Sequence, residues 1–254
     1  MNTNRHLLGA ALLAAGAVLA GAAQADTRIQ LRFTSEPFSI QGQEVPAANE
    51  TLAYWFGSEA ARLDVGDWSI IVQGSAGRVV YLNHPRRTYS EHELPISDAA
   101  AVVGPEHAAL VQEMVVPPSA ITDVRPRDEQ GEFAGHPCRY THIEISTSMF
   151  EAAVIDYIVD WCETSDLAID YRAYLALLGA RGVLLHSSPW MIPVAQRLGG
   201  FPLENRTRQF GAGIDGETRE VVESIEERPA PDGHYEIPEG YTKSRYVEIL
   251  PSTP

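Results

Sequence analysis

The sequence has little lysine and no cluster of positive charge. Lys243 is the one lysine among 19 basic residues, and 34 acidic residues bring the formal net charge of the 254-residue chain to −15. Contact with phosphates needs clustered cations, and electrostatic binding to anionic lipid headgroups needs them as well. We therefore expect no nucleic-acid partner and no charge-driven attachment to a membrane.

Long hydrophobic runs are missing from residue 26 onward. A basic start at Arg5 precedes an apolar stretch over 7–19, and an Ala-x-Ala pattern follows at 23–25. This order predicts a signal peptide over residues 1–25. An uncleaved anchor would need roughly 20 apolar residues, so we expect a cleaved leader and a periplasmic protein that is soluble, with no stable membrane insertion after cleavage.

Cysteine is equally scarce, with Cys138 and Cys162 as its two positions. They lie in two β-prone segments, 136–145 and 153–162, and the residues between them predict a turn over 146–151. Facing residues of an antiparallel hairpin have a constant sum of residue numbers. A sum of 300 places the two cysteines opposite each other, which favours a hairpin that is cross-linked through its strands.

The same cysteines have two chemical interpretations. In an oxidising compartment Cys138 and Cys162 form a disulfide, which stabilises by about 3 kcal/mol in the chain-entropy model. Alternatively, His136 and His142 share a face with both cysteines and could complete a zinc site, which requires reduced thiolates. We expect the disulfide, and neither a metal nor any other cofactor.

Alternation along this hairpin assigns its two faces. Odd positions carry apolar or aromatic side chains, whereas even positions include His142, Glu144, Asp156 and Asp160. Side chains alternate across a sheet, so the odd face should line a core or a cavity, and the disulfide should lie on the other, wetter face. The odd-numbered residues are Ile143, Ile145, Ile155, Tyr157, Val159 and Trp161.

The rest of the chain reads as short strands with a few helices inserted. We expect strands at 28–34, 51–56, 59–65, 68–72, 78–82, 86–90, 121–127, 132–133, 201–210, 217–227 and 246–250. We expect helices at 97–115, at 170–180 with a stop at Gly179 and Gly182, and from Ser188-Pro189 to Gly199-Gly200. The pattern predicts an α+β fold: one domain over 26–254, with a curved antiparallel sheet that forms an unclosed β-barrel and helices over the open side.

Motifs that carry catalysis are also missing. The sequence has no phosphate-binding loop, no dinucleotide fingerprint and no G-x-S-x-G around Ser75. Glu91-His92-Glu93 lacks the second histidine of H-E-x-x-H, and Asp156 and Asp160 are spaced too widely for a carboxylate pair. We therefore expect a protein that is not an enzyme, with a hydrolase of unknown type as a remote alternative.

Aromatic residues gather on the expected strands, among them Trp55. Ordinary core packing is one interpretation, and an apolar cavity in an incompletely closed sheet is the other. Such a cavity could take acyl chains by burial, at about 25 cal/mol per Å² of apolar surface. The cavity candidates are Tyr54, Phe56, Trp68, Ile143, Ile145, Ile155, Tyr157, Val159 and Trp161.

Several short motifs carry a resemblance to a known group. Gly135-His136-Pro137-Cys138, Trp161-Cys162-Glu163, Gly200-Phe201-Pro202 and the stretch 235–241 (Tyr-Glu-Ile-Pro-Glu-Gly-Tyr) follow the leader, the β-meander and the helices in this order. The sequence resembles an uncharacterised exported bacterial family that is similar to the LolA-like group of periplasmic lipoprotein carriers and sensors. The resemblance implies a half-open β-barrel with an apolar interior, capped by helices.

These observations lead to two main hypotheses. The first is a periplasmic protein that binds a lipid, an acyl chain or a lipidated partner protein in an apolar cavity. The second is an interaction or sensor module of the cell envelope with a filled core and no small ligand. An open or a filled interior distinguishes them.

Overall fold

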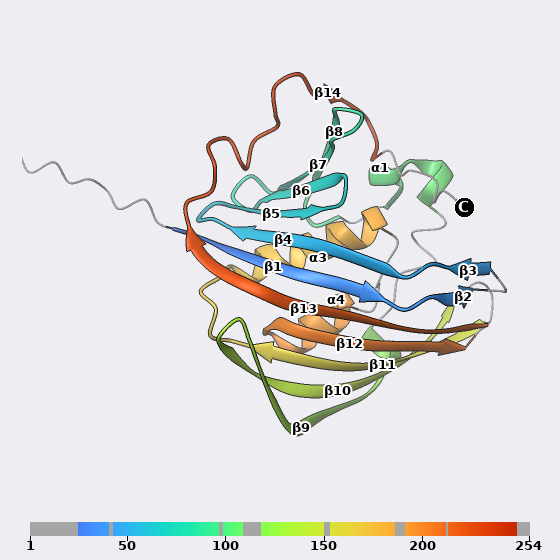
Figure 1. Ribbon diagram of the computed structural model, residues 1–254. Helices are drawn as coiled ribbons and strands as arrows, with labels where there is room; N and C mark the ends of the chain where they lie inside the picture. The colour runs from blue at the N-terminus through green and yellow to red at the C-terminus, as the bar shows by residue number, and fades with distance from the viewer. Residues whose placement is uncertain are drawn as a thin grey trace, which may run out of the picture.

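The computed structural model describes residues 25–40, 43–96, 99–108, 118–149, 153–185, 191–211 and 213–247. Within them the protein is a β-rich α+β structure built on one large, mostly antiparallel, unclosed sheet with few short helices (Figure 1). The expected fold class is confirmed at this level. Residues 1–24 of the expected signal peptide lie outside the described residues, as does Ser188-Pro189.

Most strands follow the expected meander with small shifts at their ends, but two short strands before residue 48 were not expected, and the segments expected at 121–127 and 132–133 form one strand. The strands are β1 (Asp26–Ser35), β2 (Phe38–Ile40), β3 (Gln43–Val45), β4 (Ala48–Phe56), β5 (Ala60–Val65), β6 (Trp68–Gln73), β7 (Arg78–Asn83), β8 (Thr88–Glu93), β9 (Ile121–Phe133), β10 (His136–Met149), β11 (Ala153–Thr164), β12 (Phe201–Gly211), β13 (Ile214–Arg228) and β14 (Thr242–Lys243). The helices whose bounds are described are α1 (Ala99–Val103), η1 (Pro118–Ala120), α3 (Tyr171–Leu185) and α4 (Met191–Leu198), and residues 105–108 are also helical.

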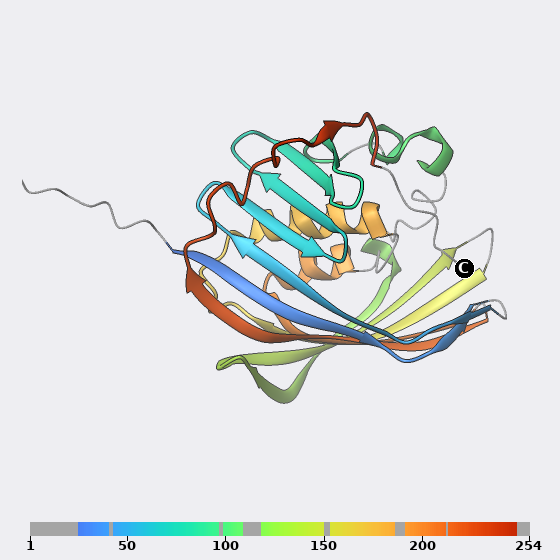
Figure 2. The ribbon, with the colours of Figure 1, turned by 45° about the horizontal axis from the view of Figure 1, so that its top comes forward.

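Neighbouring strands in the sheet follow the order β14-β8-β7-β6-β5-β4-β1-β13-β12-β11-β10-β9. The chain therefore builds one half of the sheet from β4 to β8, and the other half from β9 to β13, with β1 and β13 joining them. The sheet curves, and α3 and α4 lie against its concave side (Figure 2). The path ends at β9 on one side and at β14 on the other, so these edges do not pair with each other.

Alternation decides which side chains face the helices. In β6, Ile70 and Val72 belong to the main apolar core, whereas Ile71 belongs to a second, smaller cluster on the outer face. In β11, Val159 and Trp161 are buried whereas Asp160 between them is only half-buried, as expected from their numbers, although Cys162 is buried as well. The period of two predicted from the sequence is therefore confirmed in both halves of the sheet.

The cysteine hairpin forms with a register that differs from the expected one by two residues. Tyr140, not Cys138, faces Cys162, and the strands continue to Met149 and from Ala153. The turn predicted over 146–151 was wrong in part, because residues up to 149 are still paired. Turn length sets the register of a hairpin, and a shift by two keeps every side chain on its expected face.

The disulfide prediction is confirmed. Cys138 and Cys162 are joined with their Cα atoms 5.4 Å apart, so no thiolate is left for zinc. The expected wet surroundings were wrong, since the two residues are only 4% and 0% exposed. A Cβ atom at Gly131 of the neighbouring β9 would lie 3.2 Å from both sulfur atoms, so this part of β9 covers the disulfide closely.

Two other expectations also fail. Helix α3 continues through Gly179 and Gly182 to Leu185 instead of stopping there. Glycine weakens a helix by only about 1 kcal/mol relative to alanine, and apolar burial along this helix outweighs that cost. The strand expected at 246–250 is absent at Tyr246 and Val247, and its other residues lie outside the described ones; the terminal pairing is β14, parallel to β8.

The C-terminal segment over residues 229–247, here called the strap, crosses the outer face of the β4–β8 half (Figures 1 and 2). Tyr235, Ile237 and Tyr241 of the strap pack against the smaller outer cluster of Ile71, Val80 and Leu82. The strap then donates from the Val247 amide to the Val102 carbonyl of α1, at 2.8 Å. A sheet that is apolar on both of its faces needs a cover on each face to remove that surface from water.

Candidate functional site

The nine cavity candidates lie on one side of the sheet and belong to one apolar cluster. Each of them is at most 8% exposed. Three come from the β4–β8 half and six from β10 and β11, so the curvature of the sheet brings together residues that are far apart in the sequence. The cluster also contains the buried side chains of α3 and α4. In the described structure this candidate site is therefore a helix-covered interior.

Aromatic rings join the two halves of the interior. The Tyr54 ring centroid lies 6.0 Å from that of Tyr174 on α3 and 5.9 Å from that of Phe201 on β12. Phe56 approaches Phe201 to 6.2 Å, and Tyr174 lies 4.8 Å from Phe201. These edge-on and tilted pairs are favourable aromatic geometries, so α3 fits into the aromatic part of the concave face.

Helix α3, which covers this face, is apolar on nearly all of its surface. Its sequence Tyr-Arg-Ala-Tyr-Leu-Ala-Leu-Leu-Gly-Ala-Arg-Gly-Val-Leu-Leu contains two charged residues, Arg172 and Arg181. Arg172 is exposed, and beside its buried stripe the helix carries further apolar residues that are half-buried and also pack against the core. They are Ala173, Leu175, Ala176 and Val183. A helix that is apolar all round is typical of a buried helix.

Arg181 is the charged residue that α3 directs into the interior. Its Nη2 atom donates to Oε1 of Glu220 on β13, at 2.6 Å, and both side chains are at least nine-tenths buried. The Nε and Nη1 atoms of Arg181 are buried without a hydrogen-bond acceptor. Sequence reasoning missed this pair, because 39 residues separate its members and no local pattern joins them.

Burial also governs the tyrosines that line the interior. Desolvation raises the pKa of Tyr54, and the nearby positive charge of Arg181 opposes that rise. Burial raises the pKa of Tyr157 to about 12, and it raises that of Tyr174 well above its usual value. These phenols therefore stay neutral at physiological pH, and they contribute apolar ring surface together with a hydroxyl.

Trp55, an aromatic residue next to two cavity candidates, lies on the opposite face. The rings of Trp55 and His234 of the strap are 4.6 Å apart, and the guanidinium groups of Arg28 and Arg228 lie over the indole. Alternation between Tyr54 and Phe56 dictates this placement. Trp55 therefore helps to hold the strap and does not contribute to the interior.

The outer face of the β9–β13 half carries a buried carboxylate. The side chain of Glu204 has no exposed surface, and it accepts hydrogen bonds from Arg206 at 2.7 Å, from Arg219 at 2.7 Å and from the Tyr140 hydroxyl. Burial alone would raise the pKa of Glu204, but these hydrogen bonds outweigh it and lower the pKa. The group is thus a fixed anion between strands.

A cleft of about 460 Å³ is lined by Arg206 and Arg219, the two arginines that contact this carboxylate. Its lining carries charges of both signs, with Arg206, Arg208 and Arg219 on one hand and Glu36, Asp160 and Glu217 on the other. Arg127 donates to Asp160 at 2.9 Å. Asp160, which sequence reasoning considered and set aside as a catalytic carboxylate, is therefore one member of an ion-pair network. The cations of this cleft already have anionic partners within the protein.

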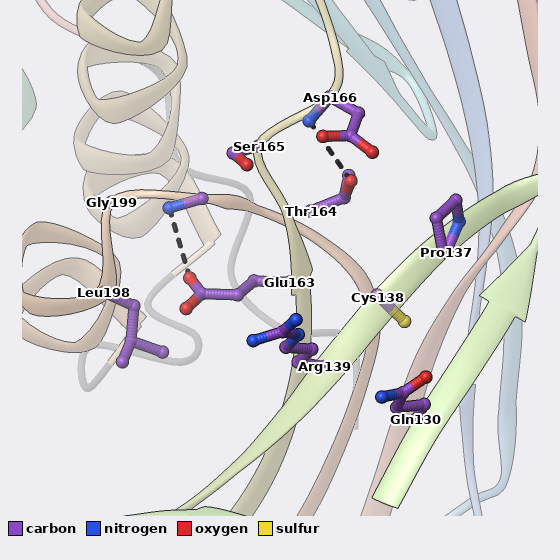
Figure 3. A pocket seen from close by; sticks show the side chains of 11 residues that line it. Gln130, Pro137, Cys138, Arg139, Glu163, Thr164, Ser165, Asp166, Leu198 and Gly199 are labelled. Carbon is purple, nitrogen blue, oxygen red and sulfur yellow. Dashed lines mark hydrogen bonds between the residues drawn. The ribbon is translucent and has the colours of Figure 1, made fainter.

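A second cleft, of about 550 Å³, lies between the disulfide and the end of α4 (Figure 3). Glu163 of β11 points toward the loop after α4, and its Oε2 atom accepts a hydrogen bond from the Gly200 amide at 3.1 Å. Burial raises the pKa of Glu163, while this hydrogen bond opposes the rise. The contact holds the end of α4 to the sheet.

Sequence reasoning also missed a polar cluster under the strap. Oγ of Ser69 lies 2.7 Å from Nε2 of His84, 2.6 Å from Oδ1 of Asp64 and 2.8 Å from Nη2 of Arg62. On its other side, Nδ1 of His84 lies 2.7 Å from the Tyr241 hydroxyl. These residues come from β5, β6, the turn after β7 and the strap, so only folding brings them together.

The protons of this cluster have one consistent arrangement. Ser69 donates to Asp64, so His84 must donate from Nε2 to Ser69 and accept at Nδ1 from Tyr241. A nucleophilic serine would instead donate to the histidine, and Ser69 has no exposed surface. Burial lowers the pKa of His84, which favours the neutral ring that this arrangement requires. The hydrogen bond between Tyr241 and His84 then anchors the strap to the sheet.

Comparisons with known proteins leave the assignment to physical argument. No protein-family model matches the chain, and no curated protein matches it significantly. Among the described residues, no helix is long and apolar enough to cross a bilayer. The disulfide is typical of an oxidising compartment outside the cytoplasm.

Proposed function

We propose that this protein is a non-enzymatic, periplasmic binder of a lipid, an acyl chain or a lipidated partner protein, with a LolA-like unclosed barrel in which α3 and α4 act as a movable cover. The observation that carries the proposal is the apolar circumference of α3 above an apolar sheet face. The hydrophobic effect is non-directional and depends on the apolar area removed from water, so one apolar group can take the place of another. An acyl chain can therefore replace the contacts that α3 makes with the sheet.

The cover is joined to the sheet mainly by such interchangeable contacts. Its polar links to the sheet include the Arg181–Glu220 pair and the hydrogen bond from the Tyr81 hydroxyl to the Ala180 carbonyl, at 3.3 Å. When α3 shifts outward, its half-buried apolar residues, which include Leu175 and Val183 and now pack against the core, can pack on a bound chain. The unclosed edge at β9 leaves room for the sheet to adapt.

A second candidate function has its own support. The nine candidate residues are nearly fully buried, and they belong to one cluster with the buried residues of the helices. This packing favours an envelope interaction module with a filled core. In that case the interior supplies stability, and a partner protein would bind the outer surface.

Native mass spectrometry of protein purified from the cell envelope, before and after delipidation, tests the two candidates. The proposed function predicts a bound lipid before delipidation and rebinding of a fatty-acyl probe afterwards, with a change in the fluorescence of the buried Trp161. Protein that carries no lipid and takes up no acyl probe would overturn it in favour of the filled-core module.

A further inference from the structure

Arg181 offers hydrogen-bond donors to the interior that the protein itself does not use. A guanidinium group has five N–H donors. Glu220 accepts from Nη2, at 2.6 Å, and the Tyr54 hydroxyl is a second neighbour that interacts with the guanidinium. The Nε and Nη1 atoms are still buried without an acceptor. Buried donors in native proteins nearly always have partners, and an unpaired buried polar group costs about 1–3 kcal/mol. The unused donors therefore call for an acceptor that enters the interior.

The charge of the site decides which acceptor fits. Arg181 and Glu220 together are neutral, and both are buried. A second anion would leave one uncompensated negative charge in an apolar interior, which is strongly unfavourable. A neutral carbonyl oxygen completes the hydrogen bonds without adding charge. The site is thus suited to an ester or amide carbonyl rather than to a carboxylate or a phosphate.

The sheet register places this pair at a border between polar and apolar surfaces. Glu220 lies in one row with Asn205 and Trp161 on the neighbouring strands. Asn205 and Thr207 are buried, and the Thr207 hydroxyl donates a hydrogen bond to Oδ1 of Asn205, at 2.9 Å. On the other side, β10 and β11 present the apolar cavity candidates. A molecule with a carbonyl at Arg181 could therefore extend a hydrocarbon chain along β11.

We propose that the unused N–H donors of Arg181, held in place by Glu220, bind the uncharged carbonyl of an acyl ester or acyl amide. This inference rests on the proposed function, because it assigns the linkage by which a bound acyl chain is recognised. Esters and amides share the acceptor chemistry, and they are separate arms of the test. Fatty acids in their charged form are disfavoured ligands.

Binding of four matched probes tests the inference. Methyl laurate, N-methyl lauramide, lauric acid and dodecane carry similar chains and differ in their polar end. We expect the ester, the amide or both to bind wild-type protein about tenfold more tightly than dodecane, the equivalent of about 1.4 kcal/mol. We also expect charged lauric acid to bind more weakly than the ester. Native mass spectrometry and tryptophan fluorescence provide the readout.

Variants of the pair test whether Arg181 is responsible. The double variant Arg181→Met with Glu220→Met removes both charges and should bind the ester and dodecane equally. Arg172→Met, on the exposed side of the same helix, is the matched control and should keep the tenfold preference. A preference that survives in the double variant would overturn the assignment to Arg181.

A further measurement does not depend on the folding of any variant. The carbonyl stretch of methyl laurate bound to wild-type protein should move to lower wavenumber than in hydrocarbon solvent, because the carbonyl accepts hydrogen bonds. An unshifted band, equal binding of ester, amide and dodecane, or tightest binding of lauric acid would each overturn the inference and leave acyl binding intact. Failure of all four probes to bind would overturn the proposed function as well.

Discussion

On the outer face of β6 and β7 apolar side chains lie under the strap, whereas on the outer face of β10–β13 charged side chains pair with one another. Ile71, Val80 and Leu82 have no exposed surface or almost none, because residues 235–241 cover them. On the other half, Glu204 is just as buried, but its cover consists of Tyr140 and two arginines. The outer face of one half is thus covered by a segment that is distant in the sequence, whereas on the other half side chains of the strands themselves cover the buried group.

The two halves also differ in the groups that titrate. Burial lowers the pKa of His84, His92 and His234, all of which belong to the β4–β8 half or to its strap. In the β9–β13 half, hydrogen bonds and nearby cations lower the pKa of Glu204 and Asp160 despite the opposing effect of burial. Acid should therefore affect the strap-covered half first, and the carboxylate network at lower pH.

The largest expected effect is the loss of the disulfide, which is found in the β9–β13 half. Cys138→Ser with Cys162→Ser should lower the free energy of unfolding by about 3 kcal/mol in oxidising buffer. Urea titrations of both proteins, with and without reductant during unfolding and refolding, measure the effect. With reductant the two proteins should become nearly equal. An equal loss in both buffers would mean that the thiols contribute by packing alone.

Glu204→Gln should have the next largest effect. It removes a buried charge but leaves Arg206 and Arg219 half-exposed, so they can be hydrated, and we expect a loss of about 2 kcal/mol. Glu217→Gln, at an exposed residue 4.0 Å from Arg208 on the same face, is the matched control and should change stability by less than about 0.5 kcal/mol. Equal losses in the two variants would contradict a special role for the buried carboxylate.

The same substitution has a defined pH dependence. Because the pKa of Glu204 is lower in the folded state than its usual 4.5, its contribution is fully present above that value and is lost as the pH falls through the folded pKa. The stability difference between wild type and Glu204→Gln should therefore shrink below about pH 4.5. A difference that stays constant down to pH 3 would show that the charge is not its source.

Tyr241→Phe tests the anchor of the strap and should cost about 1 kcal/mol, the usual value of one hydrogen bond. The substitution removes the hydroxyl that His84 binds at 2.7 Å and leaves the ring in the outer cluster. Tyr89→Phe, in the same cluster, is the matched control. Limited proteolysis within the strap should become faster in Tyr241→Phe and not in Tyr89→Phe.

The smallest expected effect is a loosening of the strap in mild acid. Below about pH 6.5 the unfolded chain binds protons that the folded state, with its lowered histidine pKa values, does not, so stability falls until the folded pKa values are reached. Amide exchange at Thr242 and Ser244, which donate to β8 and the loop before it, should accelerate at pH 5.5 after correction for the intrinsic rate. An equal acceleration of amide exchange in β10 and β11 would contradict the expectation that mild acid affects the strap-covered half first.

Much of the sheet could be predicted from local pattern. The alternation of Ile143, Ile145, Val159 and Trp161 assigned the inner face correctly, and short turns placed the strands to within a few residues. The cysteine spacing led to the disulfide, although the register was displaced by two. A displacement of this size is invisible to alternation, because it keeps every side chain on its face.

The candidate site was less predictable than the sheet. The nine apolar residues were found from their pattern, and their role as a ligand cavity stays a prediction. Arg181, Glu220 and the Ser69–His84 cluster were missed. Gly179 and Gly182 were misread as a helix stop, since the burial that overrides glycine in α3 depends on a sheet built elsewhere in the chain.

The sequence by itself determined which side chains face the same way and which cysteines could meet, because strand and helix periods are properties of neighbouring residues. Tertiary structure decided what covers each face. It alone places the strap over β6 and β7, α3 over the concave side, and the guanidinium of Arg181 against Glu220. Burial of a face or a charge requires a partner, and here each partner comes from a distant part of the chain.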